Sequence, residues 1–248
     1  MERALYNGVI SGVSLDGKKF FYANPLASIG HRQRKEWFGC ACCPPNLARL
    51  LASLGAYVYS QMTDDLVVHL YVQGEAKFDL HGQQIIFKQK TEYPWNGSIS
   101  IKINLDKPDI FGDKLRIPEW CKRAKLKVNN EEIEITGKLE KGYVRIEREW
   151  KNNDLIELDL FMPIERIYSH PNVRQNANHV AIQRAPIVYC LESIDNVDFL
   201  HKLSLTKEGN LTSIYEESLL GGVVKIVGEP KLTEDPNWKE QLYSSDKP

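Results

Sequence analysis

The sequence predicts a mainly β protein, with antiparallel β-sandwich domains preceded by a short α-helical segment. From Tyr57 onward, apolar residues alternate with polar ones at the period of two that is typical of half-buried strands. Polar turns such as Asn129-Asn130 separate these short runs, a spacing typical of antiparallel sandwiches. Before that point the pattern is one of helix, hairpin and loop. We therefore predict three parts: residues 1–56, a sandwich over 57–163, and a second, smaller β domain over 164–248.

The composition limits the classes of function. The chain has 248 residues, 42% of them apolar, which is enough for a packed core. Its 32 basic and 33 acidic residues nearly cancel, which argues against a nucleic-acid partner held by bulk electrostatics. No apolar run approaches the ~20 residues that span a membrane, and the N-terminus has no secretory h-region. We expect a cytoplasmic protein with no membrane or nucleic-acid partner.

The first elements form a helix and a hairpin. Apolar residues between Met1 and Val9 lie near helical spacing, yet no N-cap residue precedes them. A helix without a capped start leads us to expect that the chain is truncated from something longer. Ser14–Lys18 predicts a tight Asp-Gly turn, followed by a strand over Phe20–Ala23.

One longer helix is predicted after Pro44-Pro45, whose fixed φ suits a first helical turn, and Gly55 is its natural stop. Its apolar residues follow the i, i+3, i+4, i+7 pattern and lie on one face: Leu47, Leu50, Leu51 and Leu54. This face needs a partner. We expect exposed apolar surface, and therefore a homo-oligomer or association with another chain.

The strands follow in order. The strictest alternation is in Ser98–Leu105. The strands predicted for the sandwich are 67–72, 77–80, 84–88, 98–105, 114–118, 125–128, 132–135, 143–148 and 154–160. Those predicted for the smaller β domain are 164–168, 179–182, 186–191, 203–205, 219–227 and 231–232.

Three of the five cysteines, Cys40, Cys42 and Cys43, crowd together just ahead of the predicted helix. Unpaired N–H groups and the dipole at a helix N-terminus lower a thiol pKa, and zinc binds thiolates. An odd count with this spacing does not suit a disulfide framework. The cluster therefore indicates thiol or metal chemistry in a reducing compartment.

The number of local metal donors is small. His31 and Glu36 are the other nearby donors, and no second Cys-x-x-Cys follows. Free cysteines also serve as small buried hydrophobes, so that alternative stays open for the cluster. For Cys121 and Cys190, which lie in β patterns, we predict the core.

Histidines and tryptophans are the other residue types that could have a functional role. Histidines in strands or turns, such as His69 and His81, are expected to be structural or solvated. Aromatic faces also stack on sugars, but an even scatter along the chain favours packing in the core and at edges. The tryptophans concerned are Trp95, Trp120, Trp150 and Trp238.

Several stretches closely resemble the β-L-arabinofuranosidases of glycoside hydrolase family 127. They are Leu5–Gly8, Leu15–Lys18 with Phe21–Leu26, Trp37–Leu54, and Arg184–Glu192. The likeness covers most of the chain, and the Cys-Ala-Cys-Cys-Pro-Pro-Asn motif is highly specific.

The resemblance implies a retaining glycosidase with a catalytic (α/α)6 barrel followed by β-sandwich domains. Residues 1–56 are then a remnant of that barrel. The family holds zinc with three cysteines and one glutamate, uses one zinc-bound cysteine as the nucleophile, and uses a separate glutamate as acid/base.

By the same resemblance, Cys42 maps to the nucleophile and to a zinc ligand, and Cys43 to a companion ligand. Tyr22 and Glu2 map to positions that contact the sugar, and no role carries over to Cys40. Zinc suits a thiolate nucleophile because it keeps the thiol deprotonated and eases its departure in the second step.

The family's Glu-x-Cys ligand pair and its acid/base glutamate are not among these 248 residues. We therefore expect the C-terminal portion of a glycosidase for β-L-arabinofuranosides or a related sugar, inactive alone and dependent on a barrel-bearing chain. The alternatives are a non-catalytic β-sandwich module that binds carbohydrate or protein, and a small thiol or zinc protein.

Overall fold

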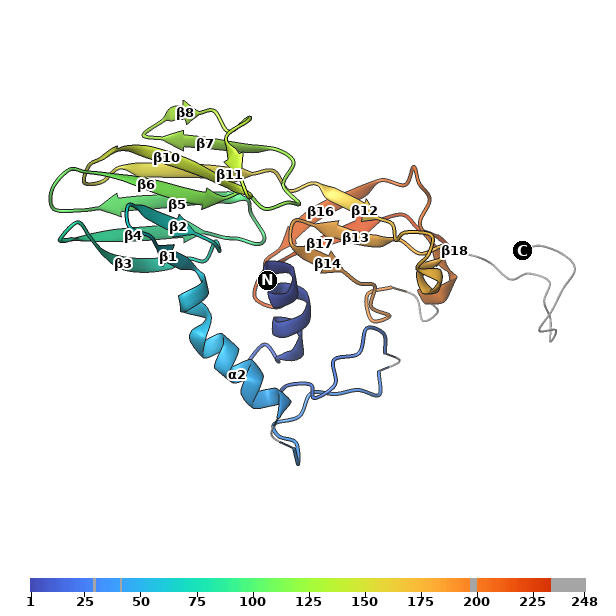
Figure 1. Cartoon of the computed structure of the whole chain (residues 1–248). Coiled ribbons are helices and arrows are strands. Elements are labelled where there is room, and N and C mark those ends of the chain that lie inside the picture. Colours follow the sequence, from blue (N-terminus) through green and yellow to red (C-terminus); the bar gives the residue numbers. More distant parts are fainter. Residues whose placement is uncertain (29, 41, 197–199, 233–248) are drawn as a thin grey trace, which may run out of the picture. The chain divides into compact units, whose positions relative to one another are not determined.

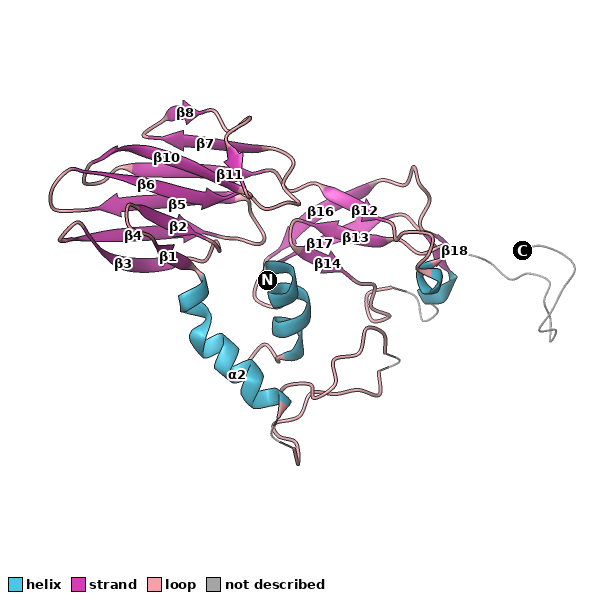
Figure 2. Ribbon diagram, viewed as in Figure 1, coloured by secondary structure: helices cyan, strands magenta, loops and turns pink. Residues whose placement is uncertain are grey.

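The computed structural model describes residues 1–28, 30–40, 42–196 and 200–232. The chain divides into two compact units. The first holds residues 1–163 with 185–187, and the second holds 164–184 with 188–248. The described chain is mainly β, which confirms the predicted fold class (Figure 2).

The first unit begins with a continuous helical stretch. It runs through α1 (Glu2–Ala4), a π-helical segment (Leu5–Val9) and a 3-10 segment (Ile10–Gly12), and no side chain caps its start. The second helix, α2 (Cys43–Ser53), continues as a 3-10 turn over Leu54–Tyr57. Both predicted helices are confirmed, and Figure 1 shows α2 leading directly into β1.

The segment between the helices is largely irregular. The turn predicted at Ser14–Lys18 is confirmed: the Gly17 N–H donates to the Ser14 carbonyl at 2.8 Å, and Gly17 has a φ of +71°. The strand predicted over residues 20–23 is wrong, because only isolated bridges pair Phe20 with Val13 and with Lys35. A short extended segment that is not hydrogen-bonded along its length to a neighbouring strand is only marginally stable as a strand.

Two sheets form the sandwich. The first has the order β1 (Tyr59–Gln61), β2 (Asp65–Val68), β6 (Asp109–Arg116), β10 (Tyr143–Trp150) and β9 (Leu139–Glu140). The second has the order β3 (Gly74–Leu80), β4 (Gln83–Thr91), β5 (Ser98–Asn104), β11 (Leu155–Leu160), β7 (Ala124–Val128) and β8 (Glu131–Ile133).

The sandwich differs from the prediction in several details, among them the strands β1 and β9, which are not in the predicted set. The pair β2–β6 is parallel, which the long connection through β3, β4 and β5 permits. The strand predicted over 67–72 ends at Val68 instead. The N–H groups of His69 and Leu70 both donate to the Val58 carbonyl, which turns the chain out of the sheet.

Both sheets contribute to one core. Trp150 is fully buried, stacks on Phe111 with 5.8 Å between ring centroids, and donates its indole N–H to the Phe111 carbonyl at 3.1 Å. The other large side chains that are fully buried are Tyr71, Phe87, Leu66, Ile85, Ile101, Ile103, Leu115, Leu126, Ile156 and Leu158. Alternation along the strands thus places one face of each sheet inside.

The second unit is made of short β elements. A three-stranded sheet has the order β12 (Ile164–Ile167), β13 (Ala181–Arg184) and β14 (Ile187–Tyr189). Two pairs follow: β15 (Leu203–Ser204) with β18 (Lys231–Leu232), and β16 (Leu211–Glu216) with β17 (Val223–Gly228). Its 3-10 turns cover Arg174–Asn176 and Leu200–Lys202. Among the described residues, no helix has the length and apolar character needed to cross a membrane.

Candidate active site

The cysteines gather where α2 begins. Cys42 lies at the N-cap and Cys43 is the first residue of the helix. The Asn46 side chain donates to the Cys42 carbonyl at 2.7 Å, which fixes the entry into the first turn. Together with Cys40 and Tyr22, Cys42 and Cys43 form a group that we call the thiol cluster.

Cys42 is the centre of the thiol cluster. Its Sγ lies 3.0 Å from the Tyr22 hydroxyl oxygen. The same Sγ lies 3.5 Å from Cys40 Sγ and 3.5 Å from Cys43 Sγ. The Tyr22 ring packs against Phe38 with 5.4 Å between centroids. All four members of the cluster are exposed, so small molecules can reach the sulfur of Cys42.

Hydrogen bonding selects one sulfur for deprotonation. The Tyr22 hydroxyl is the largest cause that lowers the pKa of Cys42 to about 7, followed by the thiols of Cys43 and Cys40. The hydrogen bond to Cys42 in turn raises the pKa of Cys43. At neutral pH about half of Cys42 is therefore thiolate, while Cys43 stays a thiol.

The sequence predicts that the helix N-terminus lowers the pKa of Cys42, but side-chain hydrogen bonds lower it more. A backbone hydrogen bond at Cys43, the first residue of the helix, also lowers the pKa of Cys42, but less than the side-chain hydrogen bonds do. Tyr22, predicted as a sugar contact, has its hydroxyl oxygen 3.0 Å from the sulfur of the candidate nucleophile. Its sugar contact stays a prediction, because no ligand is present to test it.

The described donors do not make a complete zinc site. Within residues 1–28, 30–40, 42–196 and 200–232, no group of three or more His, Cys, Asp or Glu side chains is arranged to hold a metal ion. Neither His31 nor Glu36 completes such a group with the cysteines. Structural zinc takes four ligands, and a catalytic zinc takes three from the protein. The roles of Cys42 and Cys43 as zinc ligands therefore stay predictions.

Glu2, the other predicted sugar contact, is 7% exposed and bonded to the sandwich. Its Oε1 accepts hydrogen bonds from the Tyr93 hydroxyl and from Arg116 Nη2, both at 2.5 Å. Its Oε2 accepts from the Trp120 indole N–H at 3.3 Å. Burial, and after it the Glu2 charge, raises the pKa of Tyr93, so this hydroxyl stays a donor. Both carboxylate oxygens thus anchor α1 to the sandwich, and the predicted sugar contact stays untested.

The isolated cysteines have different surroundings. Cys121 is buried, which confirms the prediction. For Cys190 the prediction of a core position is wrong, since its residue is exposed. It directly follows Tyr189, the last residue of β14, where the chain leaves the sheet.

The tryptophans and histidines are mostly structural, as predicted. Trp120 and Trp150 are buried in the core, Trp95 is half-buried, and Trp238 lies outside the described residues. His69 forms hydrogen bonds with Ser60 and Tyr143 at 2.8 and 2.7 Å. His81 contacts the carboxylates of Asp64 and Asp109 at the surface.

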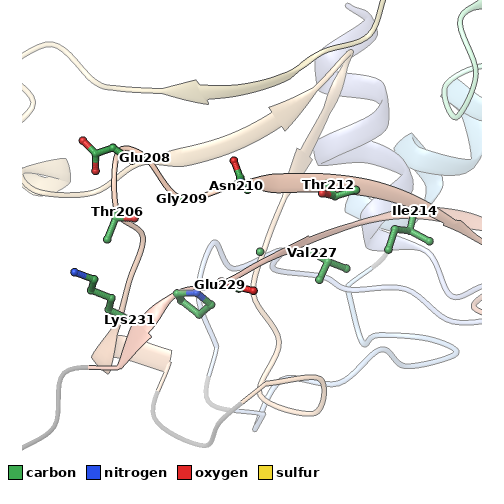
Figure 3. Close-up of a pocket in the computed structure, with 11 residues that line it drawn as sticks. Thr206, Glu208, Gly209, Asn210, Thr212, Ile214, Val227, Glu229 and Lys231 are labelled. Carbon is green, nitrogen blue, oxygen red and sulfur yellow. The ribbon is translucent and has the colours of Figure 1, made fainter.

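The second unit carries an open groove of about 660 Å³ (Figure 3). Its walls come from β16, β17 and the segments that flank them. The side chains of Ile214 and Val227 give it an apolar part. Polar groups that line it are Thr206, Glu208, Asn210, Thr212, Glu229 and Lys231.

Comparison with known families agrees with the position of the thiol cluster. The catalytic-domain profile of the GH127 β-L-arabinofuranosidases matches residues 1–56, which contain the cluster. The GH127 middle-domain profile matches residues 65–162, and the family's C-terminal-domain profile matches residues 164–230. The chain belongs to glycoside hydrolase family 127. The family profiles thus match all three parts of this GH127 chain in their order.

Individual relatives have the same fold but are longer. The chain is 33% identical over 247 residues to the non-reducing end β-L-arabinofuranosidase of Bifidobacterium longum subsp. longum, covering 90% of this chain and 36% of that enzyme. A crystal structure of a GH127 β-L-arabinofuranosidase from Geobacillus stearothermophilus T6 matches all of this chain at 45% identity and a TM-score of 0.94, over 41% of its own length. A second GH127 β-arabinofuranosidase structure matches 93% of this chain at 38% identity and a TM-score of 0.88, over 39% of its length. The GH127 chain thus spans about two fifths of these relatives.

Proposed function

We propose that this GH127 chain supplies part of the active site of a retaining glycoside hydrolase for β-L-arabinofuranosides or a related sugar, with Cys42 as the nucleophile. The observation that carries the proposal is the exposed Cys42 sulfur, hydrogen-bonded to Tyr22 at 3.0 Å and with a pKa lowered to about 7. A thiol with that pKa is about half thiolate at neutral pH, and the thiolate is the nucleophilic form.

The covalent step follows from this state. The Cys42 thiolate attacks the anomeric carbon, a C–S bond forms, and the glycosidic C–O bond breaks. The leaving oxygen takes a proton from a general acid. The conjugate base of that acid then takes a proton from a water, which attacks the anomeric carbon and displaces the Cys42 thiolate. Each of the two displacements inverts the anomeric carbon, so the net result is retention of configuration. The acid/base glutamate implied by the family is not among the 248 residues, so we propose that the chain alone does not turn over substrate.

Zinc belongs to the same proposal for the assembled protein. Cys42 and Cys43 would provide two of its four ligands, and the family's Glu-x-Cys pair would provide the other two. The described donors by themselves do not form such a site, so none of the steps above depends on the metal.

The test joins the upstream catalytic segment of the Geobacillus relative to residues 1–248. This chimera is expected to hydrolyse a chromogenic β-L-arabinofuranoside, whereas the 248-residue chain is not. Cys42→Ser should lower turnover on the order of a thousandfold or more, because it removes the attacking atom. Cys190→Ser, a matched change at an exposed cysteine outside the cluster, should leave turnover unchanged. An active Cys42→Ser chimera would contradict the nucleophile.

We also propose that the apolar face of α2 binds the rest of a catalytic barrel, on this or on a separate chain. Leu51 is 39% exposed, and Leu47, Leu50 and Leu54 are only partly buried. Exposed apolar surface of this kind favours association. Light scattering of the 248-residue chain should show self-association that a Leu47→Ser/Leu51→Ser variant reduces, and a strictly monomeric wild type would contradict this.

A non-catalytic carbohydrate-binding role is the second candidate, and the groove in Figure 3 is the observation that favours it. Titration calorimetry of the 248-residue chain with arabinose oligosaccharides should then show binding. Substituting Asn210 and Thr212 by Ala should remove this binding, while Cys42→Ser should not affect it. Absence of heat across plant glycans would exclude this role.

A further inference from the structure

We propose that Cys40 is the resolving thiol of Cys42, so that a peroxide converts the pair into a Cys40–Cys42 disulfide. Cys40 Sγ lies 3.5 Å from Cys42 Sγ, and both residues are exposed. A disulfide bond measures about 2.0 Å, so the two sulfurs need to approach by only about 1.5 Å.

Cys43 is equally near in space but is the poorer partner. Its Sγ also lies 3.5 Å from Cys42 Sγ. Adjacent Cα atoms are fixed at about 3.8 Å by the trans peptide bond, whereas disulfide-linked Cα atoms are usually about 4.4–6.8 Å apart. Cys43 is also the first residue of α2, so a bond to Cys42 would distort the start of the helix. Cys40 is separated from Cys42 by one residue, so a single peptide bond does not fix the distance between their Cα atoms. It also precedes the helix, so a bond to Cys42 would not involve a residue of α2.

The chemistry needs one equivalent of hydrogen peroxide as the oxidant. The Cys42 thiolate attacks one peroxide oxygen, which forms an S–O bond, breaks the O–O bond and releases hydroxide. The resulting sulfenic acid is then attacked by the Cys40 sulfur. An S–S bond forms, and the sulfenic oxygen leaves as water after taking up the Cys40 proton. In total, two thiols lose two electrons and two protons, and one peroxide becomes two waters.

The consequence rests on the proposed function. A Cys42 sulfur held in a disulfide cannot attack an anomeric carbon, so oxidation would switch the nucleophile off until a thiol reductant restores it. The disulfide also protects Cys42 from oxidation to sulfinic acid, which thiols do not reverse. Cys40 would thus preserve an exposed, reactive thiol.

The test uses the reduced 248-residue chain, freed of metal with EDTA and treated with one equivalent of hydrogen peroxide. After alkylation with iodoacetamide, trypsin releases the peptide Glu36–Arg49, which contains all three cysteines of the cluster. The expected peptide is two hydrogens lighter than the reduced form and carries a single carbamidomethyl group. That group should lie on the fragment that begins at Cys43. Alkylation of Cys40 would instead identify a Cys42–Cys43 bond and overturn the proposal.

Two matched variants complete the test. Cys43→Ser should still form the disulfide, whereas Cys40→Ser should not, and its Cys42 should be trapped by dimedone and then advance to sulfinic acid. A disulfide in Cys40→Ser, an intermolecular disulfide, or no disulfide in the wild type would each overturn the proposal. Circular dichroism checks the fold, and Cys121 and Cys190 serve as internal thiols that should stay reduced. Because the readout is a mass, it does not depend on sugar turnover, so this proposal and the proposed function can fail separately.

Discussion

The two parts of the first unit differ in how their residues are held. The sandwich over 57–163 has a continuous core, with Trp150 and its neighbours fully buried. In the described part of residues 1–56, the buried residues are Glu2, Leu5, Gly12 and Pro44. The thiol cluster lies in this second, open part. The reactive thiols of the chain thus lie in a segment with little core of its own, attached to a sandwich that supplies stability.

A pair of identical substitutions tests this contrast most strongly. Trp150→Ala removes a fully buried indole and is expected to cost about 3–5 kcal/mol in the free energy of unfolding. Trp37→Ala, at a residue 60% exposed in the open part, is expected to cost about 1 kcal/mol or less. Urea unfolding followed by circular dichroism measures both. Equal losses of unfolding free energy would contradict the contrast between a packed sandwich and an open N-terminal part.

The anchor between the two parts is expected to give the next largest effect. Glu2→Ala removes the carboxylate that Arg116, Tyr93 and Trp120 bond, and it leaves the Arg116 guanidinium without this partner. We expect a local cost of about 3 kcal/mol. Hydrogen exchange should speed up in residues 2–12 and stay unchanged in the sandwich. Arg3→Ala, at the exposed neighbouring residue, is the control, and slow exchange in Glu2→Ala would contradict the anchor.

The sandwich core also contains a buried carboxyl group, Asp113, whose titration should change the stability of the sandwich. Asp113 is fully buried, and within the described chain neither carboxyl oxygen has a hydrogen-bond partner. Burial, and after it the charge of Asp65, raises its pKa well above the ordinary value. A raised folded-state pKa gives stability that is present below the unfolded-state pKa and is lost as the pH rises toward the folded-state pKa.

Above roughly pH 4, the buried carboxyl should cost the wild type about 1.4 kcal/mol of unfolding free energy per pH unit. Asp113→Asn should remove this loss. The measurement is the difference in unfolding free energy between variant and wild type from pH 4 to pH 8. This difference should increase with pH in favour of Asp113→Asn. A constant difference would show that the carboxyl does not stay protonated in the folded chain.

The smallest expected effect concerns the open part and leaves stability untouched. Tyr22→Phe removes the main cause of the lowered pKa of Cys42, which should rise from about 7 toward the ordinary value of a free thiol, about 8.5. The rate of Cys42 alkylation by iodoacetamide, followed by mass spectrometry, should show its midpoint move upward in pH. Tyr57→Phe, at another exposed tyrosine, should leave the midpoint in place. An unchanged midpoint in Tyr22→Phe would show that the Tyr22 hydroxyl does not cause the lowered pKa of Cys42.

Local pattern was sufficient for much of the fold. Alternation in runs such as Ser98–Leu105 indicates that one face of the strand is buried. This burial pattern is the same for any neighbouring strand. It does not specify the neighbour, so the parallel pair β2–β6 was not predicted. It also does not specify where a strand loses its partner, which is why Phe20–Ala23 was predicted as a strand and Cys190 as a core residue.

A rare motif and a period of two are local properties of the chain, so they were enough to predict the fold class, the family and Cys42 as the candidate nucleophile. The surroundings of that sulfur depend on the tertiary structure. Tyr22 is twenty residues away from Cys42 and Arg116 is 114 residues away from Glu2, and both pairs meet through folding. Hydrogen bonds between such distant residues depend on chain geometry rather than on spacing. The main source of the lowered pKa of Cys42 and the anchoring of Glu2 therefore became visible only in three dimensions.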